Sequence, residues 1–221
     1  MITFQRPDGT SVEAYLIEPA NAHNAPGIIV IQEWWGLNDN IKMESDKYYT
    51  DLGNVNVIAV DMYDGKVAAT PDSAMKLMRG ANMERMTAII QGAIKYAGTK
   101  AAIYSVGWCF GGMWSLQTAM LAGAQAKGCV MYYGRPESNL EKLKTIQCDV
   151  IGFFGTKDNS PSPAMVNEFE NNMKSLNKNF TRNNYDAGHG FANPSNAKHD
   201  PAMSKEAYDM AIGYLKQKFG V

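Results

Sequence analysis

One short stretch of the chain combines a cysteine with three glycines and carries the strongest chemical signal. The stretch Gly107–Gly112, which reads GWCFGG, follows an apolar run and precedes a segment with helical spacing. It matches the nucleophile-elbow pattern G-x-S-x-G, with Cys109 in the serine position. The start of a helix favours a thiolate and a developing oxyanion through its partial positive charge. We therefore interpret Cys109 as a nucleophile. The competing interpretation is a buried cysteine in a glycine-rich turn.

Two further residues complete a triad in the chain order nucleophile, acid, histidine. Asp158 follows the apolar run 150–154 and a short turn, where its carboxylate could orient an imidazole. Taken alone, it could equally cap the helix expected from Pro163. His189 lies in a loop that neither a helical nor a strand pattern claims. Together with Cys109, these residues predict nucleophilic catalysis of acyl transfer.

The remaining histidines and cysteines are not assigned chemistry. His23 lies in a predicted surface loop and His199 just before the last predicted helix, so we expect both to face solvent. Cys129 and Cys148 begin apolar runs, whereas a reactive thiol needs exposure and a positive environment. Three cysteines at wide spacings form neither a disulfide framework nor a zinc pattern, which favours a reducing compartment.

The elements that must position the triad are short apolar strands. An N-terminal hairpin is expected over 2–4 and 12–17, with its turn at Asp8-Gly9. Later apolar runs with few charges are typical of strands buried on both faces. We expect these strands at 27–31, 55–60, 101–106, 129–133 and 150–154, followed by a last strand at 180–185.

Segments with helical spacing alternate with the strands. They cover 41–52, 71–96 with a break near Gly80, 110–121, 163–176 and 201–219. This alternation predicts a single α/β domain over residues 1–221, with a mostly parallel, doubly wound sheet and helices on both faces. Ligands bind such sheets at the carboxyl ends of the strands, which is where the three candidate residues fall.

Several separated words of sequence, in the same order, resemble the dienelactone hydrolase family, the cysteine-nucleophile branch of the α/β-hydrolase superfamily. The resemblance covers nearly the whole chain. The matching words are Gln32–Asn38, Asp61–Tyr63, Gly107–Gly112, Tyr132–Gly134, Gly155–Asp158 and Ala187–Ala192.

The resemblance implies an α/β-hydrolase fold and a carboxymethylenebutenolidase-like esterase that acts as a monomer. The triad would be Cys109, Asp158 and His189, working through an acyl-enzyme without metal or organic cofactor. Backbone N–H groups of Phe110 and Trp34 would hold the oxyanion, as expected for the residue after the nucleophile and for a loop after a neighbouring strand.

The resemblance also implies a role for Glu33 as a gate. In the family the matching glutamate approaches the resting thiol, and substrate binding displaces it. A carboxylate beside a thiol raises the cost of forming a thiolate until that charge is moved or neutralised, so the idea is physically sound. The alternative is an exposed or helix-capping loop glutamate.

The chain departs from the family where arginines grip the substrate carboxylate. Asn193 stands at one such position and Pro71 near the other. Arg135, after a predicted strand, is a possible substitute, although it could instead pair with Glu137 at the surface. A chiefly apolar pocket is the alternative, with Trp108 and Met78 expected in the core. The substrate-binding candidates are Trp35, Tyr63, Arg135, Phe191 and Asn193.

Composition excludes several other classes of protein. Lys and Arg number 21 against 22 Asp and Glu, giving a net charge of −1 without a polyanion-binding footprint, so we expect no nucleic-acid partner. No apolar stretch approaches the ~20 residues of a membrane-spanning helix. Met1–Ser11 lacks the apolar core of a secretory signal. A cytoplasmic protein acting on a small-molecule ester or lactone is expected.

Two rival functions remain open at this point. The same triad could serve a thioesterase or an acyltransferase, which differ in leaving group or acceptor. A low-pKa exposed cysteine also oxidises readily, so Cys109 could act in a redox sensor rather than in an enzyme. The sensor hypothesis leaves Asp158 and His189 without a task.

Overall fold

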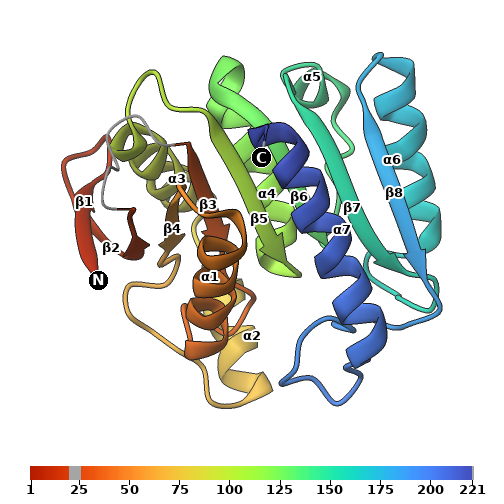
Figure 1. The fold of residues 1–221 in the computed structure, drawn as a ribbon. Coiled ribbons are helices and arrows are strands. Elements are labelled where there is room, and N and C mark those ends of the chain that lie inside the picture. Colours follow the sequence, from red (N-terminus) through yellow and green to blue (C-terminus); the bar gives the residue numbers. More distant parts are fainter. Residues whose placement is uncertain (20–25, 221) are drawn as a thin grey trace.

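The computed structural model describes residues 1–19 and 26–220, so the position of His23 lies outside the described residues. The described chain forms an eight-stranded sheet of order β1-β2-β4-β3-β5-β6-β7-β8 (Figure 1). Strand β2 runs antiparallel to both of its neighbours, β1 and β4, and the six strands β3 to β8 are parallel to one another. The strands are β1 (Ile2–Gln5), β2 (Ser11–Ile17), β3 (Gly27–Ile31), β4 (Asn56–Val60), β5 (Ile103–Trp108), β6 (Ala126–Tyr132), β7 (Asp149–Gly155) and β8 (Phe180–Tyr185).

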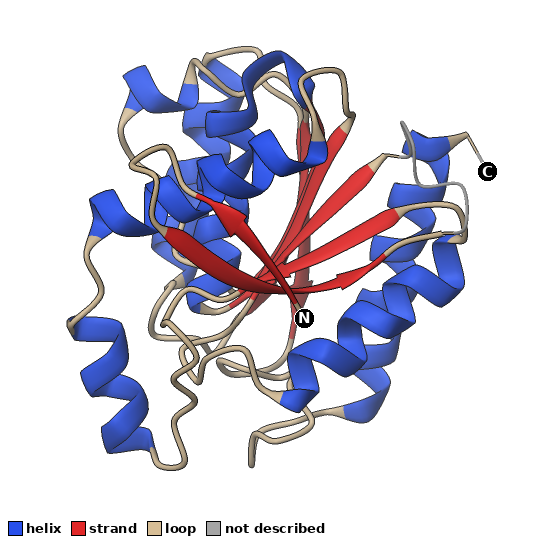
Figure 2. Ribbon diagram, turned by 90° about the vertical axis from the view of Figure 1, so that its left-hand side faces the viewer, coloured by secondary structure: helices blue, strands red, loops and turns tan. Residues whose placement is uncertain are grey.

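Helices cover both faces of the sheet, as Figure 2 shows. Residues of α1 and α7 pack on one face in one apolar cluster, and residues of α3, α4 and α6 pack on the other face in a second. The helices are α1 (Asp39–Leu52), α2 (Pro71–Arg79), α3 (Met83–Ala97), α4 (Phe110–Ala122), α5 (Leu140–Leu143), α6 (Pro163–Ser175) and α7 (Pro201–Phe219), with a 3₁₀ turn at Gly123–Gln125. The predicted α/β fold is confirmed.

The predicted break in the segment 71–96 is confirmed by two separate helices. Thr70 caps α2 in a reciprocal bond with Ser73, and Pro71 occupies the first turn, where a missing N–H costs nothing. Gly80 ends α2, and Asn82 caps α3 by accepting a bond from the N–H of Arg85. In Figure 1, α2 lies below the sheet, whereas residues of α3 pack against the sheet in the core.

The short helix α5 and the 3₁₀ turn were not predicted, because each is too brief to show a periodic pattern. None of the described helices has the length and apolar character needed to span a bilayer.

Candidate active site

Cys109 occupies the sharp turn between β5 and α4. Its backbone adopts φ 56° and ψ −116°, a left-handed conformation that non-glycine residues rarely adopt. Its N–H donates to the carbonyl of Tyr132 at 2.9 Å, and its carbonyl accepts from the N–H of Gly112 at 3.0 Å. These bonds fix the turn to the end of β6 and to the first turn of α4. The thiol is consequently held, partly exposed, above the carboxyl edge of the sheet.

The glycines around Cys109 are required by close backbone approach. A Cβ at Gly107 would collide with the backbone of Gly111, and one at Gly111 would collide with the carbonyls at the end of β3. A Cβ at Gly112 would meet the carbonyl of Tyr132. The three glycines thus allow β5, α4 and the neighbouring strands to converge beneath the cysteine.

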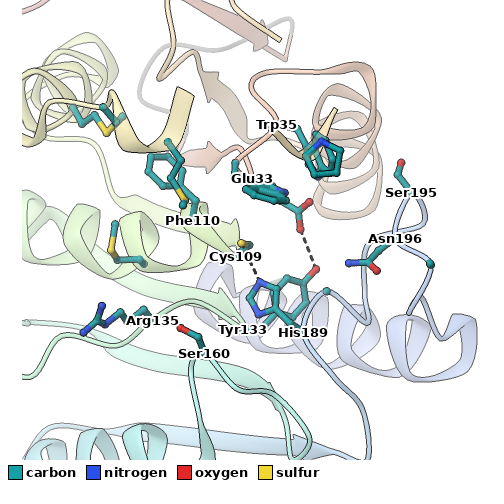
Figure 3. Close-up of a pocket in the computed structure, with 18 of the residues that line it drawn as sticks. Glu33, Trp35, Cys109, Phe110, Tyr133, Arg135, Ser160, His189, Ser195 and Asn196 are labelled. Atoms are coloured by element: carbon teal, nitrogen blue, oxygen red, sulfur yellow. Dashed lines mark hydrogen bonds between the residues drawn. The ribbon is translucent and has the colours of Figure 1, made fainter. Parts of the chain in front are cut away.

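The three predicted catalytic residues meet through hydrogen bonds, although 80 residues separate the first from the last along the chain. Nε2 of His189 lies 3.0 Å from Sγ of Cys109, and Nδ1 of His189 lies 2.7 Å from Oδ2 of Asp158. Figure 3 shows the cysteine and the histidine facing each other across the site. This arrangement can transfer a proton from the thiol to the imidazole.

Asp158 is 4% exposed and is fixed from two sides. Its Oδ1 accepts the N–H of Ser160 at 2.8 Å while Oδ2 bonds to His189. The alternative that it caps the following helix is wrong, because the side chain of Ser162 caps α6 by accepting the N–H of Met165. Asp158 is therefore free to orient the imidazole.

The protonated form of His189 is favoured where it lies. Burial acts to lower its pKa, but the hydrogen bonds with Asp158 and Cys109 and their charges outweigh burial and raise the pKa of His189 to about 10. A positively charged imidazole next to sulfur stabilises a thiolate. His189 is therefore well placed to hold a proton taken from the sulfur.

The two residues predicted to form the oxyanion hole lie beside the thiol. Phe110 is the first residue of α4, so its N–H has no acceptor within the helix, and Trp34 follows β3. Within the described residues, no hydrogen bond occupies either N–H. Both residues line the cavity that contains Cys109. The oxyanion role of these two N–H groups stays a prediction.

Glu33 is hydrogen-bonded to two neutral partners. Its Oε1 accepts the hydroxyl of Tyr133 at 3.3 Å, and its Oε2 accepts the side-chain N–H of Asn193 (Figure 3 shows the first bond). The expected contact between Glu33 and the resting thiol is not among its bonds in the described structure, where the thiol pairs with His189. Burial raises the pKa of Glu33 to about 7, against the lowering effects of Asn193, His189 and Tyr133. The gate stays a prediction.

A cavity of about 780 Å³ opens over the triad. Three groups of residues line it. The first group consists of Cys109, His189 and the residues around them: Glu33, Trp34, Trp35, Phe110 and Tyr133. The second group is apolar and comes from α2, α3, α4 and the α2–α3 turn: Pro71, Met78, Ala81, Met83, Met86 and Met113. The third group comes from loops after the strands: Arg135, Ser160, Gly190, Ser195, Asn196 and Ala197.

Trp35 and Arg135 are the two predicted substrate-binding residues that line this cavity. Tyr63, Phe191 and Asn193 are at most 5% exposed and are not among its lining residues. Tyr63 packs against the ring of Phe110, and Phe191 packs between Tyr133 and Tyr185.

One alternative at a single residue also proved wrong. Arg135 does not pair with Glu137, which instead bonds to Lys142 at 3.0 Å and to Gln117 at 3.1 Å. Met78 lines the cavity besides contacting the core, whereas Trp108 is buried, as expected.

The sequence reasoning gave no role to Tyr133, which supports the site from the end of β6. Its ring lies edge-on to His189 with 5.1 Å between centroids, and its hydroxyl donates to Glu33. Its position at a strand's carboxyl end was the available signal. Ser160, Ser195 and Asn196 were also missed, because loop residues show no periodic pattern.

In the described part of the chain, no three His, Cys, Asp or Glu side chains are grouped as a metal site would require.

Comparison with known proteins places this geometry in a family. A family model described as the dienelactone hydrolase family matches residues 12–219. "Protein usf" of Aquifex pyrophilus is 28% identical over 240 residues, covering 98% of this chain and 97% of that protein. A candidate carboxymethylenebutenolidase of Aquifex aeolicus is 27% identical, with the same coverage.

Solved structures show the same fold. A candidate dienelactone hydrolase from Klebsiella pneumoniae superposes with a TM-score of 0.83 at 20% identity, covering 98% of both chains. A dienelactone hydrolase-like promiscuous phosphotriesterase from metagenomic libraries has a TM-score of 0.83 at 19% identity, covering 98% of this chain and 97% of its own. The chain therefore belongs to the dienelactone hydrolase family and is, by that membership, a carboxylic ester hydrolase.

Proposed function

We propose that this protein hydrolyses a small ester or lactone through an acyl-enzyme on Cys109. The single observation that carries the proposal is the unbroken hydrogen-bonded chain from Sγ of Cys109 through His189 to Asp158, at 3.0 and 2.7 Å. The sulfur lies in a cavity of about 780 Å³, which is large enough for a substrate, and the order of the three residues supports the roles of nucleophile, base and orienting acid.

In the first half of the reaction, His189 takes the thiol proton and the thiolate attacks the carbonyl carbon. The carbonyl oxygen becomes an oxyanion, held by the N–H groups of Phe110 and Trp34. The bond to the leaving alkoxide then breaks, and the alkoxide takes the proton from His189. Cys109 is left as a thioester.

In the second half, His189 removes a proton from water and the resulting hydroxide attacks the thioester. The C–S bond breaks, the carboxylic acid is released, and the proton returns to the sulfur. Asp158 stabilises the imidazolium in both halves. The balance requires only water besides the ester.

The experiment compares hydrolysis of an aryl acetate by the wild-type protein and by Cys109→Ala. We expect the variant to lose at least about 10³-fold in kcat. Rapid acid quench followed by mass spectrometry of the wild-type protein should detect an acetyl group on the peptide that contains Cys109. Cys148→Ala, which changes a thiol that does not line the cavity, is the matched control and should retain full activity.

Equal rates for wild type and Cys109→Ala would contradict the proposal. An acetyl group on another residue would assign the nucleophile elsewhere. Faster turnover of a thioester than of the matched oxygen ester would convert the proposal to a thioesterase with the same triad.

A further inference from the structure

The cavity above Cys109 is divided into an apolar side and a polar side. The apolar side comes from helices: Met78 of α2, Met83 and Met86 of α3, and Met113 of α4. Flexible methionine side chains fit irregular apolar groups well. The polar side comes from loops.

The polar side is carried by the loop after β8. It contains the exposed side chain of Ser195 and the half-buried side chain of Asn196, whereas Ser160 lies across the site, near Arg135 (Figure 3). In Figure 3, Phe110 lies on one side of Cys109 and His189, and Ser195 and Asn196 lie on the other. The reacting sulfur therefore lies between two chemically different surfaces.

The position of His189 decides which surface receives which half of an ester. The leaving alkoxide must accept its proton from Nε2 of His189, so the alcohol group lies on the side of that ring. Gly190, Ser195 and Asn196 come from the same loop as His189 and line the cavity there. The acyl group must then extend to the opposite side, where the methionines lie.

The charges around the cavity favour a neutral acyl group. Arg135 is the one Lys or Arg among the described lining residues, and its side chain is exposed at the rim. Glu33 is buried among the lining residues, and its two hydrogen-bond partners are neutral. Because Arg135 is exposed, solvent screens its charge, and a carboxylate on the acyl group would lose its hydration among the methionines with little compensation.

The volume points the same way. A cavity of about 780 Å³ lies in the range that encloses drug-sized ligands, well beyond a single lactone ring. We infer that the preferred substrate is an ester of an uncharged, medium-length or aromatic acyl group with a small polar alcohol. This inference rests on the proposed function, because it assigns the two halves of the substrate relative to Cys109 and His189.

The first test uses glycol monoesters of acetic, butanoic, hexanoic and octanoic acids with the full-length protein, and acid release is followed in a pH-stat. We expect kcat/KM to rise at least about tenfold from acetate to hexanoate, since each buried methylene adds favourable transfer free energy. Met78→Ala and Met113→Ala should reduce the hexanoate-to-acetate ratio several-fold.

Matched variants separate pocket shape from folding. Met113→Leu keeps the side-chain volume and should keep the hexanoate-to-acetate ratio. Met43→Ala changes a methionine of α1 that is 60% exposed, and this variant should have the wild-type ratio. A ratio that is flat or falls with chain length in the wild type, while Cys109→Ala is inactive, would overturn the acyl assignment and leave the hydrolase proposal intact. Hydrolysis no faster than by Cys109→Ala across the series would defeat the proposed function itself.

The second test concerns the alcohol side. The glycol ester of hexanoic acid should react several-fold faster than its butyl ester, and Asn196→Leu should narrow that difference. Preference for the butyl ester would overturn the assignment of the polar loop to the alcohol.

Discussion

At the residue scale, the site contains two acidic side chains with different hydrogen-bond partners. Asp158 is hydrogen-bonded to an imidazole and a backbone N–H, whereas Glu33 has only a phenol and an amide as partners. Burial penalises the charged form of Glu33. The two carboxyl groups therefore have different hydrogen-bond partners, although they lie in the same site.

Replacing Asp158 tests the orienting role. Asp158→Asn keeps the side-chain shape but cannot stabilise an imidazolium, and we expect kcat to fall by about 10²–10⁴-fold. The thiol should also alkylate more slowly with iodoacetamide at pH 7, since the imidazolium that supports the thiolate is weakened. Asp209→Asn, on the exposed side of α7, is the control. A variant with wild-type kcat would remove Asp158 from the triad.

Glu33 makes a prediction about stability against pH. Its pKa rises from an ordinary 4.5 to about 7 on folding. Between these two pH values, the carboxyl group therefore keeps its proton in the folded state and loses it in the unfolded state. Its contribution to stability is full below pH 4.5 and is lost as the pH rises towards 7, by about 3 kcal/mol in all.

Urea unfolding of the wild type and of Glu33→Gln between pH 4.5 and 8 measures this contribution. The variant should show a smaller fall in unfolding free energy over that interval, whereas Glu141→Gln, at an exposed position, should follow the wild type. Parallel curves for Glu33→Gln and the wild type would mean that the Glu33 pKa is not raised by folding.

At the scale of elements, the nucleophile depends on how closely α4 approaches the sheet. The approach is possible because Gly111 presents no side chain to the carbonyls of Ile31 and Gln32. Ser115 fixes the next turn by donating to the carbonyl of Val130 at 2.8 Å. The position of α4 therefore determines the position of Cys109, which directly precedes this helix.

Two glycine-to-alanine variants should have opposite effects on stability. Gly111→Ala forces α4 away from β3 and should cost at least about 2 kcal/mol of unfolding free energy. Gly213→Ala lies in the exposed interior of α7, with nothing within 4 Å of its Cβ, and should add about 0.5–1 kcal/mol. Urea unfolding followed by circular dichroism measures both. Equal destabilisation would show that packing at Gly111 does not control the elbow.

At the scale of the whole molecule, the sequence predicts the helices and strands better than it predicts the contacts between distant loops. The order of strands and helices and the broken helix at Gly80 follow from local apolar patterns, and these were confirmed. The bond between Glu33 and Asn193 joins loops 160 residues apart, and no local pattern encodes it. Strand ends also shifted, as at β5, because Gly107 and Trp108 continue the ladder into the turn.

Stability should be unevenly distributed over the molecule. In α2 only Ala74 is buried, whereas α4 buries nine of its residues between the sheet and its neighbours. Figure 1 shows α2 below the sheet, at the end where the site lies. Helices with few buried contacts open locally at low free energy.

Hydrogen exchange followed by mass spectrometry should find the amides of α2 exchanging at least about 100-fold faster than those of α4 at neutral pH. A non-hydrolysable hexanoyl ketone, bound over Cys109, should slow exchange in α2 more than in α6, because Pro71 and Met78 line the cavity and α6 does not. Unchanged exchange in α2 on binding would mean that the acyl group does not reach that helix. Equal exchange in α2 and α4 without ligand would mean that burial does not set local stability in this fold.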